Sequence, residues 1–361
     1  MTEHKLIIHS RPRADLDWQC PRKRYWHYEY DGKGIVTDTT YLELYLGTTI
    51  HDGLAAFAHG KGIEEVAAAA HAQMLESLLK PEAHTPEEEE FAKEQATLTE
   101  GLLRGFHKHV WPRLMEEYPT IVAIEEPMTY KHDGLAFLAK PDLVVEDKEG
   151  NFWYIEYKST SSKKDAWINS WETAIQLHAT VRAIEQTKGV KLTGVVVQGL
   201  YKGYETYGKQ TSPFCYAYRK SGNPPFLEDQ ISYEYRAGWK KYPVWNLEGG
   251  IKSWVENMSS ELLADQFPQA PPIFVKDDLI DAFFKQRAFR EQQIRDTMQG
   301  EITEIELNEI FPMHFDKCVP SFGKPCAYKR LCFSPVQDPL TAGYEYRDSS
   351  HELEWFIHNG T

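Results

Sequence analysis

Hydrophobic residues are spaced in two different ways along the chain. Between 41 and 111 they recur at every third or fourth position, as Leu46, Ile50 and Leu54 do, which is typical of amphipathic helices. From about 121 onward they gather in short runs of β-branched and aromatic residues, which turn residues separate. The pattern therefore predicts helices first and a sheet afterwards.

The helical part divides into three segments. Helices are expected over 41–60, 63–79 and 85–111. Thr85 stands before a proline and a run of glutamates, which is typical of a helix N-terminus, and Pro112 is expected to end the third helix.

Four strands and one crossover helix are expected next. The strands lie at 121–126, 136–146, 152–158 and 192–200. A helix over 165–188 connects the last two strands, and Gly189 ends it. This order predicts an α/β fold with a mixed central sheet flanked by helices.

The changes of pattern give three segments. A helical N-terminal segment covers 1–115, a sheet-forming core covers 116–220, and 221–361 returns to loops and helices, including a helix over 277–299. We expect the three segments to pack as one compact unit, because 361 residues with a hydrophobic fraction of 42% supply a sizeable core.

The formal net charge of −14 counts against a nonspecific nucleic-acid binder, since such proteins gain affinity by releasing counterions from phosphates. Basic residues are nevertheless concentrated at 22–24 and 163–164, and local fields guide a strand into a cleft. No apolar stretch approaches about 20 residues, and the polar start lacks the apolar core of a secretory signal. A cytoplasmic, intracellular protein without membrane contact is expected.

Two acidic residues and a lysine are expected to meet on a β-hairpin. The polar turn at 147–151 joins two strands, and a hairpin centred on Glu149 places Asp142 opposite Glu156, with Cβ atoms about 4.5–5.5 Å apart. Lys158 lies two residues beyond Glu156 and points to the same face. Carboxylates at this spacing are able to hold Mg²⁺ or Mn²⁺, and a nearby ammonium suits phosphodiester hydrolysis. A hairpin whose alternate polar residues face water explains the pattern equally well.

Glu125 and Glu126 end the strand at 121–126. One of them is placed to reach the same metal site from a neighbouring strand. Helix capping or simple solvation explains the two residues equally well.

Four of the five cysteines lie near the two ends of the chain. Cys20 is near the start, and Cys318, Cys326 and Cys332 follow near the finish with C-x7-C-x5-C spacing. Four thiolates are the ligand set of an iron–sulfur cluster, and an odd cysteine count argues against a disulfide framework. The spacing lacks the short knuckle usual for structural zinc, so zinc is the less favoured alternative, beside unrelated thiols. Cys215 is expected to be a buried strand residue.

The segments Pro141-Asp142 and Glu156-Tyr157-Lys158 resemble the motif of the PD-(D/E)xK nuclease superfamily. With one N-terminal and three C-terminal cysteines around that motif, the chain is similar to the RecB-like nucleases that carry an iron–sulfur cluster, including the Cas4 and AddB nucleases of bacteria and related phage proteins. The resemblance implies a restriction-endonuclease-like sheet, an N-terminal helical region and a C-terminal iron–sulfur element. Its four cysteines would hold a [4Fe-4S] cluster.

Two further positions match that family. Gly47 to His51 resembles its G-x-x-x-H motif, whose histidine is a metal ligand, and Gln176 stands where the family carries a glutamine. Thr180 departs from the family, which usually has tyrosine at that place. The resemblance implies that the metal ligands are His51, Asp142 and Glu156, that Lys158 orients water and stabilises charge, and that Gln176 positions the scissile strand.

The function expected from the resemblance is a divalent-metal-dependent DNA nuclease, with exonuclease action on single-stranded or duplex ends in recombination, repair or phage DNA processing. A protein partner that delivers the DNA would fit the acidic charge. The alternatives are a catalytically silent DNA-binding or assembly subunit with the same scaffold, and an iron–sulfur redox protein.

Overall fold

The computed structural model describes residues 7–37, 42–79, 84–132, 134–161, 164–171, 175–202, 204–206, 209–211, 213–219, 238–298, 302–319, 325–333 and 338–347. Among the described helices, none combines the length and the apolar character needed to cross a bilayer.

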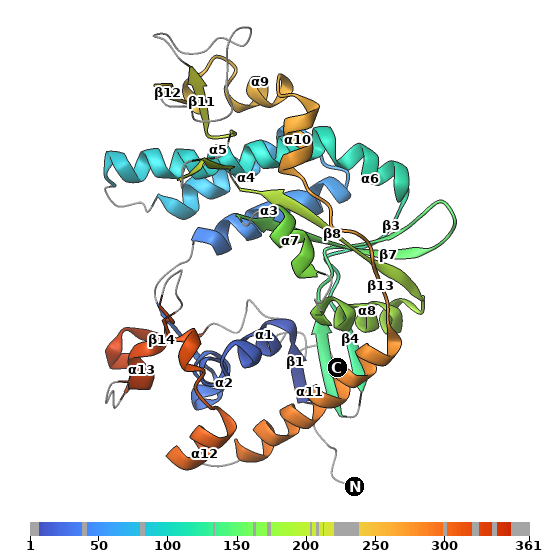
Figure 1. Cartoon of the computed structure of the whole chain (residues 1–361), viewed down its shortest axis with the longest axis vertical. Coiled ribbons are helices and arrows are strands. Elements are labelled where there is room, and N and C mark those ends of the chain that lie inside the picture. Colours follow the sequence, from blue (N-terminus) through green and yellow to red (C-terminus); the bar gives the residue numbers. More distant parts are fainter. Residues whose placement is uncertain are drawn as a thin grey trace.

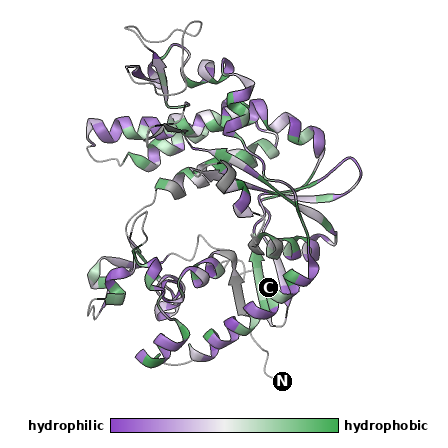
Figure 2. Cartoon of the chain, in the orientation of Figure 1, coloured by the Kyte–Doolittle hydropathy of each residue, from purple (hydrophilic) through white to green (hydrophobic). Residues whose placement is uncertain are grey.

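The expected N-terminal helices are confirmed, with one change at the end of the third. The helices are α3 (Leu42–Ala58), α4 (Ile63–Leu78), α5 (Pro86–His109) and α6 (Trp111–Glu117). Thr85 and Glu88 cap α5 reciprocally, each side chain bonding the backbone N–H of the other residue. Pro112 lies in the first turn of α6, where a missing N–H costs nothing, so the chain turns at Val110 and continues as a helix. In Figure 2 these helices carry both hydrophilic and hydrophobic residues along their length, as amphipathic helices do.

The central sheet is mixed, as expected. Its strands are β3 (Thr120–Ile124), β6 (Leu143–Glu146), β7 (Phe152–Thr160), β8 (Leu192–Tyr201) and β13 (Ile273–Phe274), in the order β13-β8-β7-β6-β3. Strands β7 and β8 are parallel, and the other neighbours are antiparallel. The crossover between β7 and β8 contains two helices, α7 (Lys164–Trp171) and α8 (Ile175–Lys188), where one was expected.

The strand expected over 136–146 is in fact two strands in different sheets. Strand β5 (Leu135–Ala139) pairs with β1 (Ile7–Ser10) and β4 (Met128–His132), whereas β6 belongs to the central sheet. Pro141 has no N–H to donate to a strand partner, so a continuous strand is interrupted there. The chain turns at this corner, and Asp142 lies on it.

The order of elements also differs from the expectation that helices precede every strand. Strands β1 and β2 (Ile35–Thr37) come before α3. The remaining elements are η2 (Tyr30–Gly32), β9 (Tyr204–Thr206), β10 (Lys209–Thr211), β11 (Tyr216–Arg219), β12 (Lys240–Pro243), η3 (Val244–Asn246), α9 (Gly250–Glu256), α10 (Ser260–Gln266), η4 (Phe315–Lys317) and η5 (Pro339–Ala342).

Each face of the central sheet has its own hydrophobic core. On one face α3, α4 and α5 cover side chains such as Ile155 and Tyr157. On the other face α8 and α11 (Asp277–Thr297) cover side chains such as Val144 and Tyr154. The alternation along β7 follows the two-residue period of a strand, so Glu156 lies on the Tyr154 face.

The two ends of the described chain lie side by side. The N-terminal elements α1 (Arg11–Gln19), α2 (Pro21–Arg24) and η1 (Tyr25–Glu29) are next to α11, α12 (Glu304–Ile310) and α13 (Lys329–Phe333) (Figure 1). Strand β14 (Tyr344–Tyr346) pairs antiparallel with β2. The segments before and after the sheet therefore build one shared layer.

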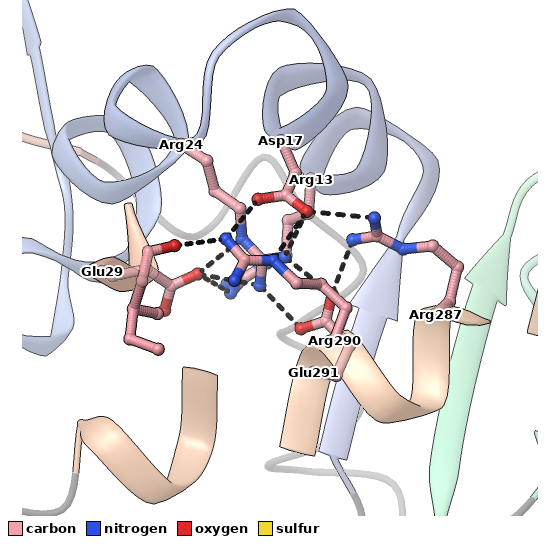
Figure 3. Close-up of polar contacts among 8 residues, drawn as sticks. Arg13, Asp17, Arg24, Glu29, Arg287, Arg290 and Glu291 are labelled. Atoms are coloured by element: carbon pink, nitrogen blue, oxygen red, sulfur yellow. Dashed lines mark hydrogen bonds and ion pairs between the residues drawn. The ribbon is translucent and has the colours of Figure 1, made fainter. Parts of the chain in front are cut away.

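A buried ionic network joins these ends (Figure 3). Arg24, with 1% of its surface exposed, donates to both carboxylate oxygens of Glu291 at 2.6 Å. Arg287 bridges Glu291 at 2.9 Å and Asp17 at 3.0 Å. The network continues through Arg290, Arg13 and Glu29. It connects α1, α2 and η1 to α11.

Candidate active site

His51 and Asp142 come from different layers and meet. Helix α3 carries His51, and the corner between β5 and β6 carries Asp142. The Nδ1 atom of His51 and the Oδ1 atom of Asp142 are 2.9 Å apart. Buried Ile50 and Leu54, on the neighbouring face of α3, pack that helix against the sheet and so position the imidazole.

The hairpin has the register that the sequence predicts. Leu143 lies opposite Ile155 and Glu146 opposite Phe152, which is the register of a hairpin centred on Glu149, and Asp142 directly precedes the first paired residue of β6. The backbone N–H of Tyr157 donates to Oδ2 of Asp142 at 2.7 Å, which fixes this carboxylate on the edge of β7. Both oxygens of Asp142 are thus oriented by the protein.

Glu156 is nearly inaccessible to solvent, with 3% of its surface exposed. One of its carboxylate oxygens is paired with the Lys158 ammonium, and the other accepts a hydrogen bond from the Tyr154 hydroxyl. A buried carboxylate needs such partners, because an unpaired charge in a dry site is costly. Tyr154 was not among the expected site residues, although its position two residues before Glu156 on one strand places both on the same face.

Three ligand groups able to hold one metal ion lie together. Atoms of His51, Glu125 and Asp142 are all within 4.8 Å of one another, the one such group of three found in the described part of the chain. Glu125 follows the end of β3, and its N–H donates to the backbone oxygen of Asp142 at 3.1 Å. Its carboxylate is paired with Lys140. Glu126 is instead paired with Lys188.

The pKa of His51 is raised by its neighbours in the site. Burial lowers the pKa of His51, but the Asp142 carboxylate and its hydrogen bond raise it by more, so that the net pKa lies above the ordinary value. A protonated imidazole cannot be a metal ligand, so metal binding through His51 must release a proton. Imidazole nitrogen and carboxylate oxygen are donors that Mg²⁺ or Mn²⁺ accepts, and the residues present therefore fit such an ion.

The other expected site residues are placed less completely. Gln176 is the second residue of α8, and its side chain lies outside the described ones. Thr180 is buried one turn later on that helix. Lys158 is partly exposed beside the metal-binding group, from where it can reach a phosphate.

Cys20 and Cys318, from the two ends of the chain, both bond His314: its N–H donates to the Cys20 sulfur at 3.4 Å, and its carbonyl oxygen accepts from the Cys318 thiol at 3.7 Å. Cys20 and Cys318 are buried, Cys326 and Cys332 are half-buried, and all four are free thiols. Burial and the neighbouring thiols of Cys20 and Cys326 raise the pKa of Cys318. For Cys332 burial is again the largest cause of a raised pKa, opposed by Trp26 and Arg22 and reinforced by Cys326 and Cys20. The N–H of Cys326 donates to the carbonyl oxygen of Cys318 at 3.0 Å, which joins these two cysteines through the backbone.

A mixed sheet with an aspartate directly before one strand, a glutamate and a lysine on the adjacent strand, and a helical histidine in contact with the aspartate defines a nuclease-type scaffold. The family model of the PD-(D/E)XK nuclease superfamily matches residues 18–333. The chain belongs to this superfamily, as the motif resemblance predicts. No curated protein matches the chain.

Proposed function

We propose that the protein is a divalent-metal-dependent DNA nuclease of the Cas4/RecB-like type, an exonuclease that acts on single-stranded or duplex ends in recombination, repair or phage DNA processing. The observation that carries the proposal is the contact of His51 with Asp142, near the buried Glu156 and its partly exposed partner Lys158. Superfamily membership supplies the reaction class.

The protein groups divide the work of hydrolysis between them. His51, Asp142 and Glu156 are the proposed ligands of Mg²⁺ or Mn²⁺, an ion that stabilises charge on the phosphate and activates water when bound. The Tyr157 N–H holds Asp142 in its orientation. Lys158 offers its ammonium to the water nucleophile and to the developing negative charge. Gln176 positions the scissile strand.

The cysteines are the proposed ligands of a [4Fe-4S] cluster with a structural role. The position of Cys20 and Cys318 on the same residue, His314, and the backbone bond of Cys326 to Cys318 support a shared group. Zinc is the less favoured alternative, because the C-x7-C-x5-C spacing lacks the short knuckle usual for structural zinc.

The test is cleavage of end-labelled single-stranded and duplex DNA with Mg²⁺ or Mn²⁺. Wild type should degrade DNA from the ends, and Asp142→Asn should lose at least a hundredfold in rate, since a metal-bound carboxylate is removed. Glu149→Gln, at the exposed tip of the hairpin, is the matched control and should cleave as wild type does. If wild type binds DNA but is as inert as Asp142→Asn, the protein is the silent assembly subunit instead.

A further inference from the structure

Glu156, the acidic residue expected as the third metal ligand, already has two strong partners. The Lys158 ammonium and the Tyr154 hydroxyl engage its two carboxylate oxygens, and the side chain is buried. It does not belong to the group of described ligand atoms that lie within 4.8 Å of one another. The position beside His51 and Asp142 is taken by another residue.

That residue is Glu125. Its carboxylate comes within 4.8 Å of ligand atoms of both His51 and Asp142. The hydrogen bond from its N–H to the backbone oxygen of Asp142 joins the two residues directly, so the positions of their side chains are coupled. With Glu125 added to His51, Asp142 and Glu156, an octahedral Mg²⁺ ion would still have positions open for water and phosphate.

The backbone at Glu125 has a conformation that disfavours a residue with a side chain. Its φ is +44°, one of two positive values found among the described non-glycine residues. Glycine would adopt this conformation without a steric cost, so a glutamate here is retained at the expense of stability. Such strain is found where a side chain must be aimed at a site.

Lys140 is paired with Glu125. The ammonium of Lys140 bonds the Glu125 carboxylate and is itself about half exposed, with a side-chain exposure of 47%. An exposed ion pair contributes little stability, so its exchange for a metal ion costs little. Lys140 therefore compensates the negative charge of Glu125 and still leaves its carboxylate available to bind a metal ion.

We infer that Glu125 is a protein ligand of the active-site metal ion, together with His51 and Asp142, and that Lys140 is the cation that competes with the metal for it. The inference rests on the proposed metal-dependent nuclease. It adds a ligand from the residue that follows β3 to the proposed ligands from α3, the corner before β6, and β7.

The test is the affinity for Mn²⁺, measured by calorimetry on the full chain without DNA at one fixed neutral pH. Glu125→Gln should bind Mn²⁺ at least tenfold more weakly than wild type, because a charged ligand is lost. Lys140→Met should bind it more tightly, by about twofold to fivefold, because a competing ammonium is removed. Opposite signs at two residues in contact cannot come from a general loss of structure.

Glu126→Gln is the matched control. This neighbouring glutamate is paired with Lys188, and its substitution should leave the Mn²⁺ affinity unchanged. Glu125→Gly separates metal binding from folding, because glycine adopts the positive φ without strain. In EDTA this variant should have an unfolding temperature equal to or above that of wild type. It should still bind Mn²⁺ more weakly than wild type.

Wild-type affinity in Glu125→Gln or Glu125→Gly, alongside weakened binding in Asp142→Asn, would overturn the inference and leave the proposed nuclease intact. If wild type itself binds no Mn²⁺, the metal-dependent function fails together with the inference.

Discussion

The Nδ1 atom of His51 lies 2.9 Å from the Oδ1 atom of Asp142, across 91 positions of the sequence. The contact joins the helical layer to the corner where the chain passes from one sheet to another. Each residue depends on a contact outside its own segment. The buried face of α3 packs in the core and so places His51, and the N–H of Tyr157 on β7 holds Asp142. Small changes in either support will therefore reach the site.

Tyr154→Phe removes the hydroxyl that bonds Glu156 in a buried site. We expect the cleavage rate to fall by about tenfold and the free energy of unfolding to fall by about 1–2 kcal/mol, because a buried carboxylate loses one partner. Steady-state kinetics and urea unfolding measure the two effects. Tyr216→Phe removes a hydroxyl bond to Glu94 away from the site and is the matched control. It should lower stability by a similar amount and leave cleavage unchanged, and a loss of cleavage in both variants would contradict the role given to Tyr154.

Glu291→Gln tests the buried ionic network between the ends of the chain. Glu291 bonds both Arg24 and Arg287, which are almost fully buried, and the neutral amide leaves two guanidinium groups without full compensation. We expect a loss of about 3–5 kcal/mol in the free energy of unfolding, measured by urea denaturation. Glu89→Gln, which breaks an exposed pair with Lys93, should cost less than about 0.5 kcal/mol. Equal losses in the two variants would show that the network contributes no special stability.

The hairpin register followed from the sequence because its turn and its alternation are local. Polar residues at 147–151 fix the loop, and the register then pairs Leu143 with Ile155, beside Asp142 and Glu156. The helices of the N-terminal half followed for the same reason, since each buries one stripe of its surface.

What the sequence did not reveal depends on contacts between distant segments. Pro141 marks the break between β5 and β6 locally, but the pairing of β5 with β1, from the start of the chain, is a contact between distant segments. The placement of Glu125 rather than Glu126 beside His51 depends on a positive φ that no periodicity predicts. The network around Arg24 joins residues 267 positions apart, which local patterns do not encode.

Substitution of Cys332 tests the proposed cluster. Protein purified without oxygen should contain about four iron atoms per chain and absorb broadly in the visible range, and Cys332→Ala should lose most of both, since a thiolate ligand is missing. Cys215→Ala is the matched control, because Cys215 is buried in the turn before β11 and bonds the backbone oxygen of Glu94. Iron analysis and absorbance spectra decide the question. If the purified protein contains zinc in place of iron, the proposed iron–sulfur cluster is wrong, although the four cysteines would still be the metal ligands.

His27 is expected to make stability depend on pH. Burial is the largest cause that lowers its pKa from 6.5 to about 4, and Arg347, Lys23 and Arg13 add to it. The Tyr328 hydroxyl donates to the carbonyl oxygen of Ile35, so the Nδ1–H of neutral His27 donates to Tyr328 at 2.8 Å.

Between pH 6.5 and about 4 the unfolded chain takes up a proton at His27 that the folded chain refuses. The stability from the neutral imidazole is therefore complete above pH 6.5 and falls as the pH approaches 4, by roughly 3 kcal/mol at most. His27→Gln removes this dependence, so the stability advantage of wild type, measured by urea unfolding, should shrink as the pH falls from 7 to 5. Exposed His59 is the matched control, and His59→Gln should keep the wild-type pH profile. A constant difference between wild type and His27→Gln across this range would mean that His27 does not couple protons to folding.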